Sequence, residues 1–201
     1  MSQSFDISPG LKPKAQQEMG RWVTEQLALL DELLSEPLRI LVWGPGNVAP
    51  DAQGQERKKA VVLKRLQIRD ELINRGHAAI FSEHWPSDKP DISIKLWEYT
   101  QACTAHLVIL LIEESPGGQG EMHDFSVYEE VVHKLWVMFP RRYENSYAAM
   151  SVGSLLDSAH GRVHWYLDDE IESCQVLAYA LKCAAKTREA AALRKMIGGK
   201  R

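Results

Sequence analysis

Short apolar runs alternate with longer stretches of mixed polarity along most of this chain. The runs have strand length and lie at residues 39–43, 77–81, 106–112, 134–139 and 162–167. Helices are expected between and after them, over about 56–75, 92–103, 121–132, 147–158 and 169–197, the last capped by Asp168 or Asp169. Strands that alternate with helices predict an α/β fold, in which a five-stranded parallel sheet carries helices on both faces.

An additional helix is predicted before the first strand. Apolar residues recur at steps of three and four over 13–36, and Pro37 ends the pattern (Met19, Trp22, Val23, Leu27, Leu30, Leu33). This stripe is a packing face for the domain or for a partner subunit. The expected organisation is a tail and helix over 1–37 and an α/β domain over 38–201. The basic end of the last helix is either solvated or a docking site for a partner or nucleic acid.

Composition narrows the class of protein. The chain has 201 residues, of which 45% are hydrophobic and 25% charged, which excludes a disordered chain and a small disulfide scaffold. The net charge of -3 gives no general attraction for nucleic acid. Three cysteines without a CxxC pair fit a reducing compartment and predict no metal site. Without a long apolar run or a signal peptide, we expect a cytoplasmic protein with no membrane partner.

Ligands of such sheets bind beyond the carboxyl ends of the strands. After the third strand, a glycine-rich loop containing Gly118 and Gly120 leads to Glu121 at a predicted helix start. Glycines let backbone N–H groups approach a ligand, and a carboxylate there can attack an electrophilic carbon or stabilise a developing cation. The alternative is that Glu121 only complements the helix dipole.

Other polar groups follow the first two strands. The turn Gly44-Pro45-Gly46-Asn47 is either a cradle for sugar and phosphate or an ordinary tight turn. Glu83, His84 and Trp85 come after the second strand, where His84 either transfers protons or is a plain surface residue. His123 and Asp124 beside Glu121 either orient a substrate or are ordinary helix residues. No GxSxG nucleophile motif occurs.

The order of these motifs resembles the nucleoside 2-deoxyribosyltransferase-like superfamily, which includes deoxynucleoside monophosphate N-glycosidases and is distantly similar to TIR-type NAD-cleaving domains. The similarity spans about 38–185. Its pieces are Ile-Leu-Val-Trp-Gly-Pro-Gly from residue 40, Leu-Ile-Asn-Arg-Gly-His-Ala-Ala-Ile-Phe-Ser-Glu-His from 72, Leu-Trp-Glu-Tyr-Thr-Gln-Ala-Cys-Thr-Ala-His-Leu-Val-Ile from 96, Ser-Pro-Gly-Gly-Gln-Gly-Glu from 115, Asn-Ser-Tyr from 145 and His-Trp-Tyr from 164. The resemblance implies a flavodoxin-like, doubly wound core with an extra N-terminal helix and a long C-terminal helix.

The resemblance also implies an activity, which is cleavage of an N-glycosidic bond in NAD or a (deoxy)nucleotide without a cofactor. Glu121 takes the position of the nucleophile at C1′, and Glu98 stands where relatives carry an Asp that assists the departing base. The substrate-binding positions it implies, together with those read from the strand ends, are Trp43, Gly44, Gly46, Asn47, Glu83, His84, Trp85, Gly118, Gly120, Asp124, Asn145 and Ser146. In relatives, the segment matching Asn145 and Ser146 often reaches a neighbouring subunit's site, so a homo-oligomer or a larger complex is expected.

Two departures from the family pattern leave alternatives open. Met122-His-Asp-Phe125 replaces the usual small residues after the glutamate, and His106 replaces a customary Asp. The motif form is similar to a divergent branch found beside bacterial defence genes, including retron effectors, which implies a toxin. The alternative is a silent nucleotide-binding sensor or a regulatory subunit of a larger assembly. Of the six tryptophans, Trp43 and Trp85 are the ones predicted to stack on a base or nicotinamide ring.

Overall fold

A computed structural model describes residues 12–46, 54–84, 92–113, 127–146, 149–150, 153 and 162–198. The chain divides into two compact units. One comprises Met1–Glu36 together with Arg188–Arg201, and the other comprises Pro37–Thr187. Each unit is described by itself below.

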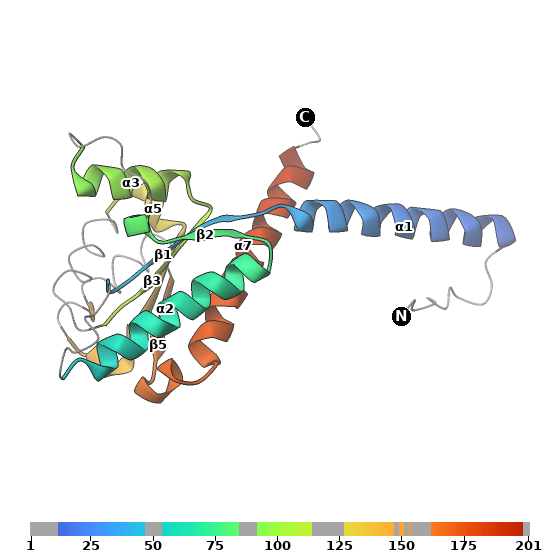
Figure 1. Ribbon diagram of the computed structural model, residues 1–201. Coiled ribbons are helices and arrows are strands. Elements are labelled where there is room, and N and C mark those ends of the chain that lie inside the picture. Colours follow the sequence, from blue (N-terminus) through green and yellow to red (C-terminus); the bar gives the residue numbers. More distant parts are fainter. Residues whose placement is uncertain are drawn as a thin grey trace. The chain divides into compact units, whose positions relative to one another are not determined.

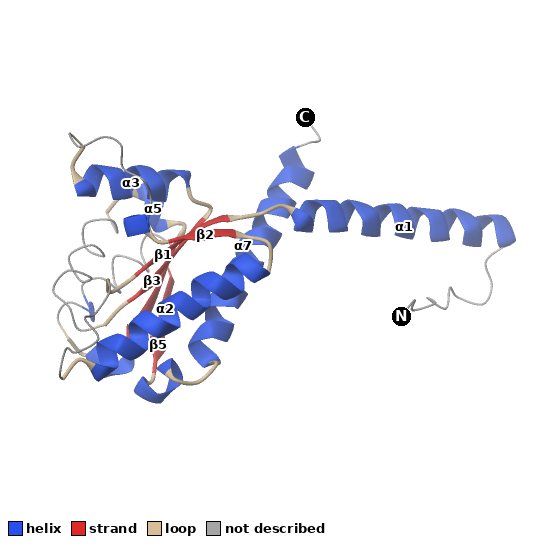
Figure 2. Cartoon of the chain, viewed as in Figure 1, coloured by secondary structure: helices blue, strands red, loops and turns tan. Residues whose placement is uncertain are grey.

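The larger unit is built on a five-stranded sheet. Its strands are β1 (Arg39–Trp43), β2 (Ala78–Ile80), β3 (Leu107–Leu111), β4 (Leu135–Pro140) and β5 (Arg162–Tyr166). They are arranged in the order β2-β1-β3-β4-β5, and every neighbouring pair is parallel (Figure 2). This confirms the predicted α/β, flavodoxin-like fold with a five-stranded parallel sheet, an N-terminal helix and a long C-terminal helix.

Helices cover both faces of the sheet (Figure 1). The helices α2 (Glu56–Asn74) and α7 (Gln175–Gly198) supply the apolar cluster on one face. The helices α3 (Ile94–Thr104) and α5 (Glu129–Val132) supply the cluster on the other face. Among the described residues, no helix combines the length and apolarity that crossing a membrane requires.

Strand β3 lies at the centre of this arrangement, and all five of its residues are buried. Its side chains alternate between the two clusters: Leu107, Ile109 and Leu111 face α2 and α7, whereas Val108 and Leu110 face α3 and α5. This alternation explains why the run is apolar at every position rather than at every second one. Polar side chains on this strand can therefore occur only beyond its ends.

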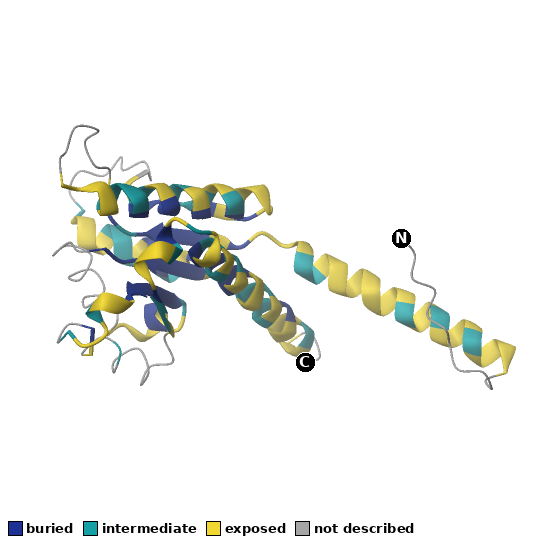
Figure 3. Cartoon of the chain, turned by 90° about the horizontal axis from the view of Figure 1, so that it is seen from below, coloured by how far each residue is buried: buried dark blue, intermediate teal, exposed yellow. Residues whose placement is uncertain are grey.

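The N-terminal helix α1 (Pro13–Ser35) begins with a proline in its first turn and ends before Pro37, as the sequence predicts. None of its residues is buried, and Trp22 in its apolar stripe is 59% exposed (Figure 3). Within the same unit, Glu36 pairs with Lys195 near the end of α7. The stripe is therefore uncovered in this structure, and a partner subunit on it stays a prediction.

The start of the last helix differs from the prediction. A separate 3-10 turn, η3 (Asp168–Ile171), precedes α7, which begins at Gln175 rather than at 169. The turn has its own cap, because the Glu170 carboxylate accepts a hydrogen bond from the Leu167 backbone N–H at 2.8 Å. Ser173 Oγ accepts from the Gln175 N–H at 3.3 Å. Asp168, expected as the helix cap, instead pairs with arginines.

The glycine turn after β1 packs directly against β3. Gly44 has a φ of 152°, which L-residues rarely adopt, and a Cβ built on it would lie 2.7 Å from the Leu111 carbonyl oxygen. Only a residue without a side chain fits this contact. By contrast, a Cβ on Gly46 would meet nothing within 4 Å. The first glycine of the turn is thus required by packing, and the second is not.

Replacing these two glycines gives a matched test. We expect Gly44→Ala to lower the free energy of unfolding by about 1–3 kcal/mol, because the new Cβ strains the backbone and collides with β3. Gly46→Ala should change it by less than about 0.5 kcal/mol. Urea unfolding of both variants and the wild type measures the difference. Equal stability of the two variants would contradict the close approach.

A half-buried histidine on β5, His164, predicts a pH dependence of stability. His164 stacks on Tyr179 with ring centroids 3.8 Å apart. Burial lowers the pKa of His164 from its ordinary value, although the Glu170 carboxylate opposes this shift. In the unfolded chain the His164 imidazole binds a proton near pH 6.5, whereas in the folded chain it does so only at lower pH. The free energy of unfolding should therefore fall as the pH drops below about 6.5.

The measurement is urea unfolding at about pH 7.5 and about pH 5.5. His164→Phe keeps an aromatic ring against Tyr179 and removes the titrating group, so its loss of stability on acidification should be smaller than in the wild type. His133→Gln, at an exposed histidine, is the control and should behave like the wild type. An identical loss in the wild type and His164→Phe would refute the assignment.

Candidate functional site

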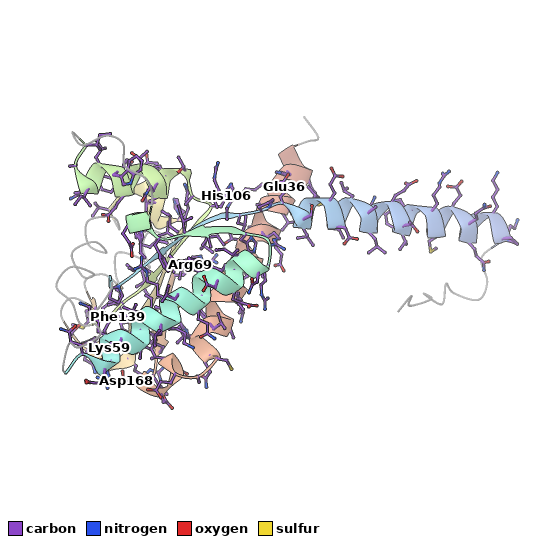
Figure 4. The ribbon with its side chains drawn as sticks, viewed as in Figure 1. Glu36, Lys59, Arg69, His106, Phe139 and Asp168 are labelled. Atoms are coloured by element: carbon purple, nitrogen blue, oxygen red, sulfur yellow. The ribbon has the colours of Figure 1, made fainter. Side chains whose placement is uncertain are left out.

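Charged or conformationally special residues follow each strand at its carboxyl end. They are Gly44 after β1, Glu83 after β2, Glu113 after β3, Arg142 after β4 and Asp168 after β5. Figure 4 places Asp168 at this end of the sheet, beside the start of α2, and His106 at the opposite end. In a sheet of order 2-1-3-4-5, the strand order reverses between β1 and β3, because β2 is added on one side of β1 and the later strands on the other; ligands of such folds bind at that point.

Arg65 on α2 holds the first two strand ends together. Its guanidinium donates to the Val42 carbonyl from Nε at 3.0 Å and from Nη2 at 2.8 Å, and to the Pro45 carbonyl from Nη1 at 3.2 Å. It also forms two hydrogen bonds to Glu83, at 2.5 and 2.8 Å. Arg65 is 3% exposed, and its charge lies over the Phe81 ring. The residue therefore fixes the glycine turn relative to the end of β2.

The contact with Arg65 changes the interpretation of Glu83. Both of its carboxylate oxygens accept hydrogen bonds from Arg65, so its first role is to hold the crevice wall. Direct substrate binding, as the sequence predicts, would have to compete with this two-point ion pair.

Glu98 lies on α3, the helix that follows the β2 end. The residue is half-buried, and this burial raises the pKa of its carboxyl group; the negative charge of Glu83 raises it further. The fold thus brings two of the predicted site residues into electrostatic contact, from segments of the chain that periodicity alone does not join. A carboxyl group with a raised pKa keeps its proton to a higher pH and is a candidate general acid.

A second charged cluster lies at the ends of β3, β4 and β5, and no sequence motif indicated it. Arg142 pairs with Glu113 through one nitrogen and with Asp168 through another. Arg57, in the first turn of α2, pairs with the other oxygen of Asp168 at 2.8 Å. Burial alone would lower the pKa of Arg142, but Tyr143, Glu113 and Asp168 raise it on balance. Arg142 therefore stays charged and joins three strand ends.

Tyr166, the last residue of β5, lies next to this cluster. Its hydroxyl donates to the Ile112 carbonyl at 2.6 Å, and the side chain is fully buried. Burial and then the nearby Glu113 carboxylate raise the pKa of the phenol, so it remains a hydrogen-bond donor. The tyrosine fixes the residue immediately before Glu113. A polar residue directly after a fully apolar run was the available sequence signal for Glu113.

The structure corrects the prediction for Trp43. The residue is 3% exposed and belongs to the apolar cluster beneath α3 and α5, because its side chain alternates onto that face of β1. It therefore packs in the core and offers no open ring face for stacking on a base.

Gly46 lies in the turn after β1, and Asn145 and Ser146 are the described residues of the predicted closing segment that were assigned to the site. Asn145 is exposed. Ser146 caps the next short helical stretch, where its Oγ accepts from the Ala149 N–H at 3.2 Å. His84 ends the turn η1 (Ser82–His84). The remaining predicted site residues lie outside the described part of the chain: Asn47, Trp85, Gly118, Gly120, Glu121 and Asp124.

The described groups define what this edge can do chemically. Over 12–46, 54–84, 92–113, 127–146, 149–150, 153 and 162–198, no three His, Cys, Asp or Glu side chains are placed to hold a metal ion. The three cysteines are free thiols. What the described residues present is a half-buried carboxyl group at Glu98, whose pKa is raised by burial, and carboxylates that are held by arginines. Such groups bind polar organic ligands and transfer protons.

Comparison of the sequence with protein families and with curated proteins finds no match. No protein-family model matches the chain. No curated protein matches it either. The function proposed next therefore depends on the residues of this chain and on the order of their motifs.

Proposed function

We propose that this protein cleaves the N-glycosidic bond of NAD or of a (deoxy)nucleotide. The bond between C1′ and the base nitrogen breaks, and its electron pair leaves with the base. Glu121 stabilises or traps the oxocarbenium-like carbon, and water or an acceptor base then completes the reaction at C1′. The motif order described above motivates the placement of Glu121.

The observation that supports the proposal most directly is the raised pKa of the half-buried Glu98 carboxyl group. A half-buried carboxyl group whose pKa is raised by burial and by Glu83 holds its proton at a higher pH than an ordinary glutamate does. A purine or pyrimidine leaving group needs such a proton on departure. Glu98 lies on the helix that follows the β2 end, and ligands of this fold bind at the same edge of the sheet.

The leaving group separates the two substrate classes. Nicotinamide departs from NAD as a neutral molecule, because its ring nitrogen is already positively charged, so it gains little from an acid. A departing nucleobase carries away negative charge unless it is protonated. A rate that depends strongly on Glu98 therefore indicates a nucleotide substrate, and a rate that depends little on Glu98 indicates NAD.

A role as a toxin effector in bacterial defence belongs to the same proposal, and the resemblance to the defence-associated branch supports it. Consumption of NAD or nucleotides by such an enzyme would halt an infected cell. A homo-oligomer, with Asn145 and Ser146 near a neighbour's site, is also part of the proposal. The alternative is a sensor that binds nucleotides without turnover, and the same assay distinguishes it.

The experiment incubates the purified full-length chain with NAD and with nucleoside monophosphates, and follows free nicotinamide or free base by chromatography. Glu121→Gln should abolish product formation from every substrate. Glu98→Gln should slow release of a nucleobase by about 10²-fold or more, yet change release of nicotinamide far less. Wild-type nucleobase release should fall as the pH rises through the raised pKa of Glu98, because the acid form is lost.

Glu32→Gln, at an exposed glutamate on α1, is the control and should keep full activity. If Glu121→Gln retains full activity, or no substrate yields product, the enzyme proposal fails. Saturable nucleotide binding without product would instead support the sensor.

A further inference from the structure

Glu113 lies at the point where ligands enter folds of this type. The strand order reverses between β1 and β3, and Glu113 is the second residue after β3. On the β1 side of the same point, Gly44 packs against the Leu111 carbonyl and contributes no side chain of its own between the two strand ends. Topology thus places Glu113 at the edge of the sheet where ligands of this fold class bind, independently of any motif.

The carboxylate of Glu113 is only half satisfied. The residue is 4% exposed, and Oε1 accepts a hydrogen bond from Arg142. Its second oxygen, Oε2, is buried and finds no hydrogen-bond partner among the described residues. Native proteins rarely leave a buried carboxylate oxygen without a donor, and a ligand is a common reason for the exceptions.

The charges around Glu113 indicate what kind of donor is missing. Arg142 serves both Glu113 and Asp168, and Arg57 serves Asp168 as well, so two carboxylates face two guanidinium groups. Among the described residues, these four charges balance without a ligand. An anion such as a phosphate would meet the free carboxylate oxygen and be repelled. A cation would leave the cluster with excess positive charge. A neutral O–H group supplies the missing hydrogen bond and leaves the balance unchanged.

We propose that Glu113 binds the sugar of the ligand, by accepting a hydrogen bond from a ribose 2′- or 3′-hydroxyl on Oε2. Arg142 and Tyr166 act as positioning residues: Arg142 holds Oε1, and the Tyr166 hydroxyl holds the Ile112 carbonyl just before Glu113. The inference rests on the proposed function for the ligand class, a nucleotide. It concerns binding alone and requires no turnover.

The proposal predicts selectivity for hydroxylated sugars. The test measures dissociation constants by titration calorimetry on the full-length chain, with adenosine 5′-monophosphate and its 2′,3′-dideoxy analogue as probes. We expect the wild type to bind the ribonucleotide at least about tenfold more tightly, because the dideoxy analogue leaves Oε2 unpaired. The 2′-deoxy and 3′-deoxy analogues then show which hydroxyl is bound.

Glu113→Gln removes the charge that strengthens the hydrogen bond, and we expect the preference to fall to less than about threefold. Glu172→Gln, at an exposed glutamate outside the cluster, is the control and should keep the tenfold preference. A purely structural role for Glu113 would weaken both ligands equally in Glu113→Gln and leave the ratio unchanged, which overturns the proposal.

The wild-type arm does not depend on whether Glu113→Gln folds. If the wild type binds both probes equally, or binds neither, the inference is wrong. Turnover assays separate this result from the proposed function. If product forms but the two sugars bind equally, the inference about Glu113 is wrong and the proposed function stands. If binding is selective and depends on Glu113 but no product forms, the inference stands and the proposed function is wrong.

Discussion

Burial of β3 on both faces is the constraint on which the rest of this structure depends. Helices cover the sheet on either side, so every side chain from Leu107 to Ile112 must be apolar. A parallel sheet also brings all its carboxyl ends to one edge, because each crossover returns the chain to the same starting side. Polar groups are therefore excluded from the interior of the strands and gather at that edge.

Two arginines join the strand ends along this edge. Arg65 joins the β1 turn to the end of β2, and Arg142 joins the ends of β3, β4 and β5. Removing water from a guanidinium is costly, so the buried Arg65 pairs with two carbonyls and a carboxylate, whereas the more exposed Arg142 pairs with two carboxylates. The carboxylates that the arginines hold most completely become structural. Two other carboxyl groups differ: Glu113 has one oxygen without a hydrogen-bond partner among the described residues, and burial raises the pKa of Glu98.

Strand positions were predictable to within one or two residues. Apolar runs of strand length, bounded by glycine and polar residues, leave little choice in a chain that must bury them. The last helix was predicted too early, because Glu170 caps a separate turn that periodicity cannot distinguish from a first helical turn. Trp43 was assigned to the crevice for a similar reason. Its position at a strand end was predictable, but the face that its side chain occupies depends on the register of the sheet.

The sequence by itself determined the fold class, the strand order along the chain and the edge at which polar residues collect, because these follow from local periodicity and from the need to bury apolar runs. Only the tertiary structure decided which charges meet. Glu113 and Arg142 are 29 residues apart in the chain, and Arg57 and Asp168 are 111 apart. Their pairing depends on the lateral order β3-β4-β5 and on where α2 crosses the sheet. No local pattern encodes that, since ion pairs need only proximity and leave no spacing in the sequence.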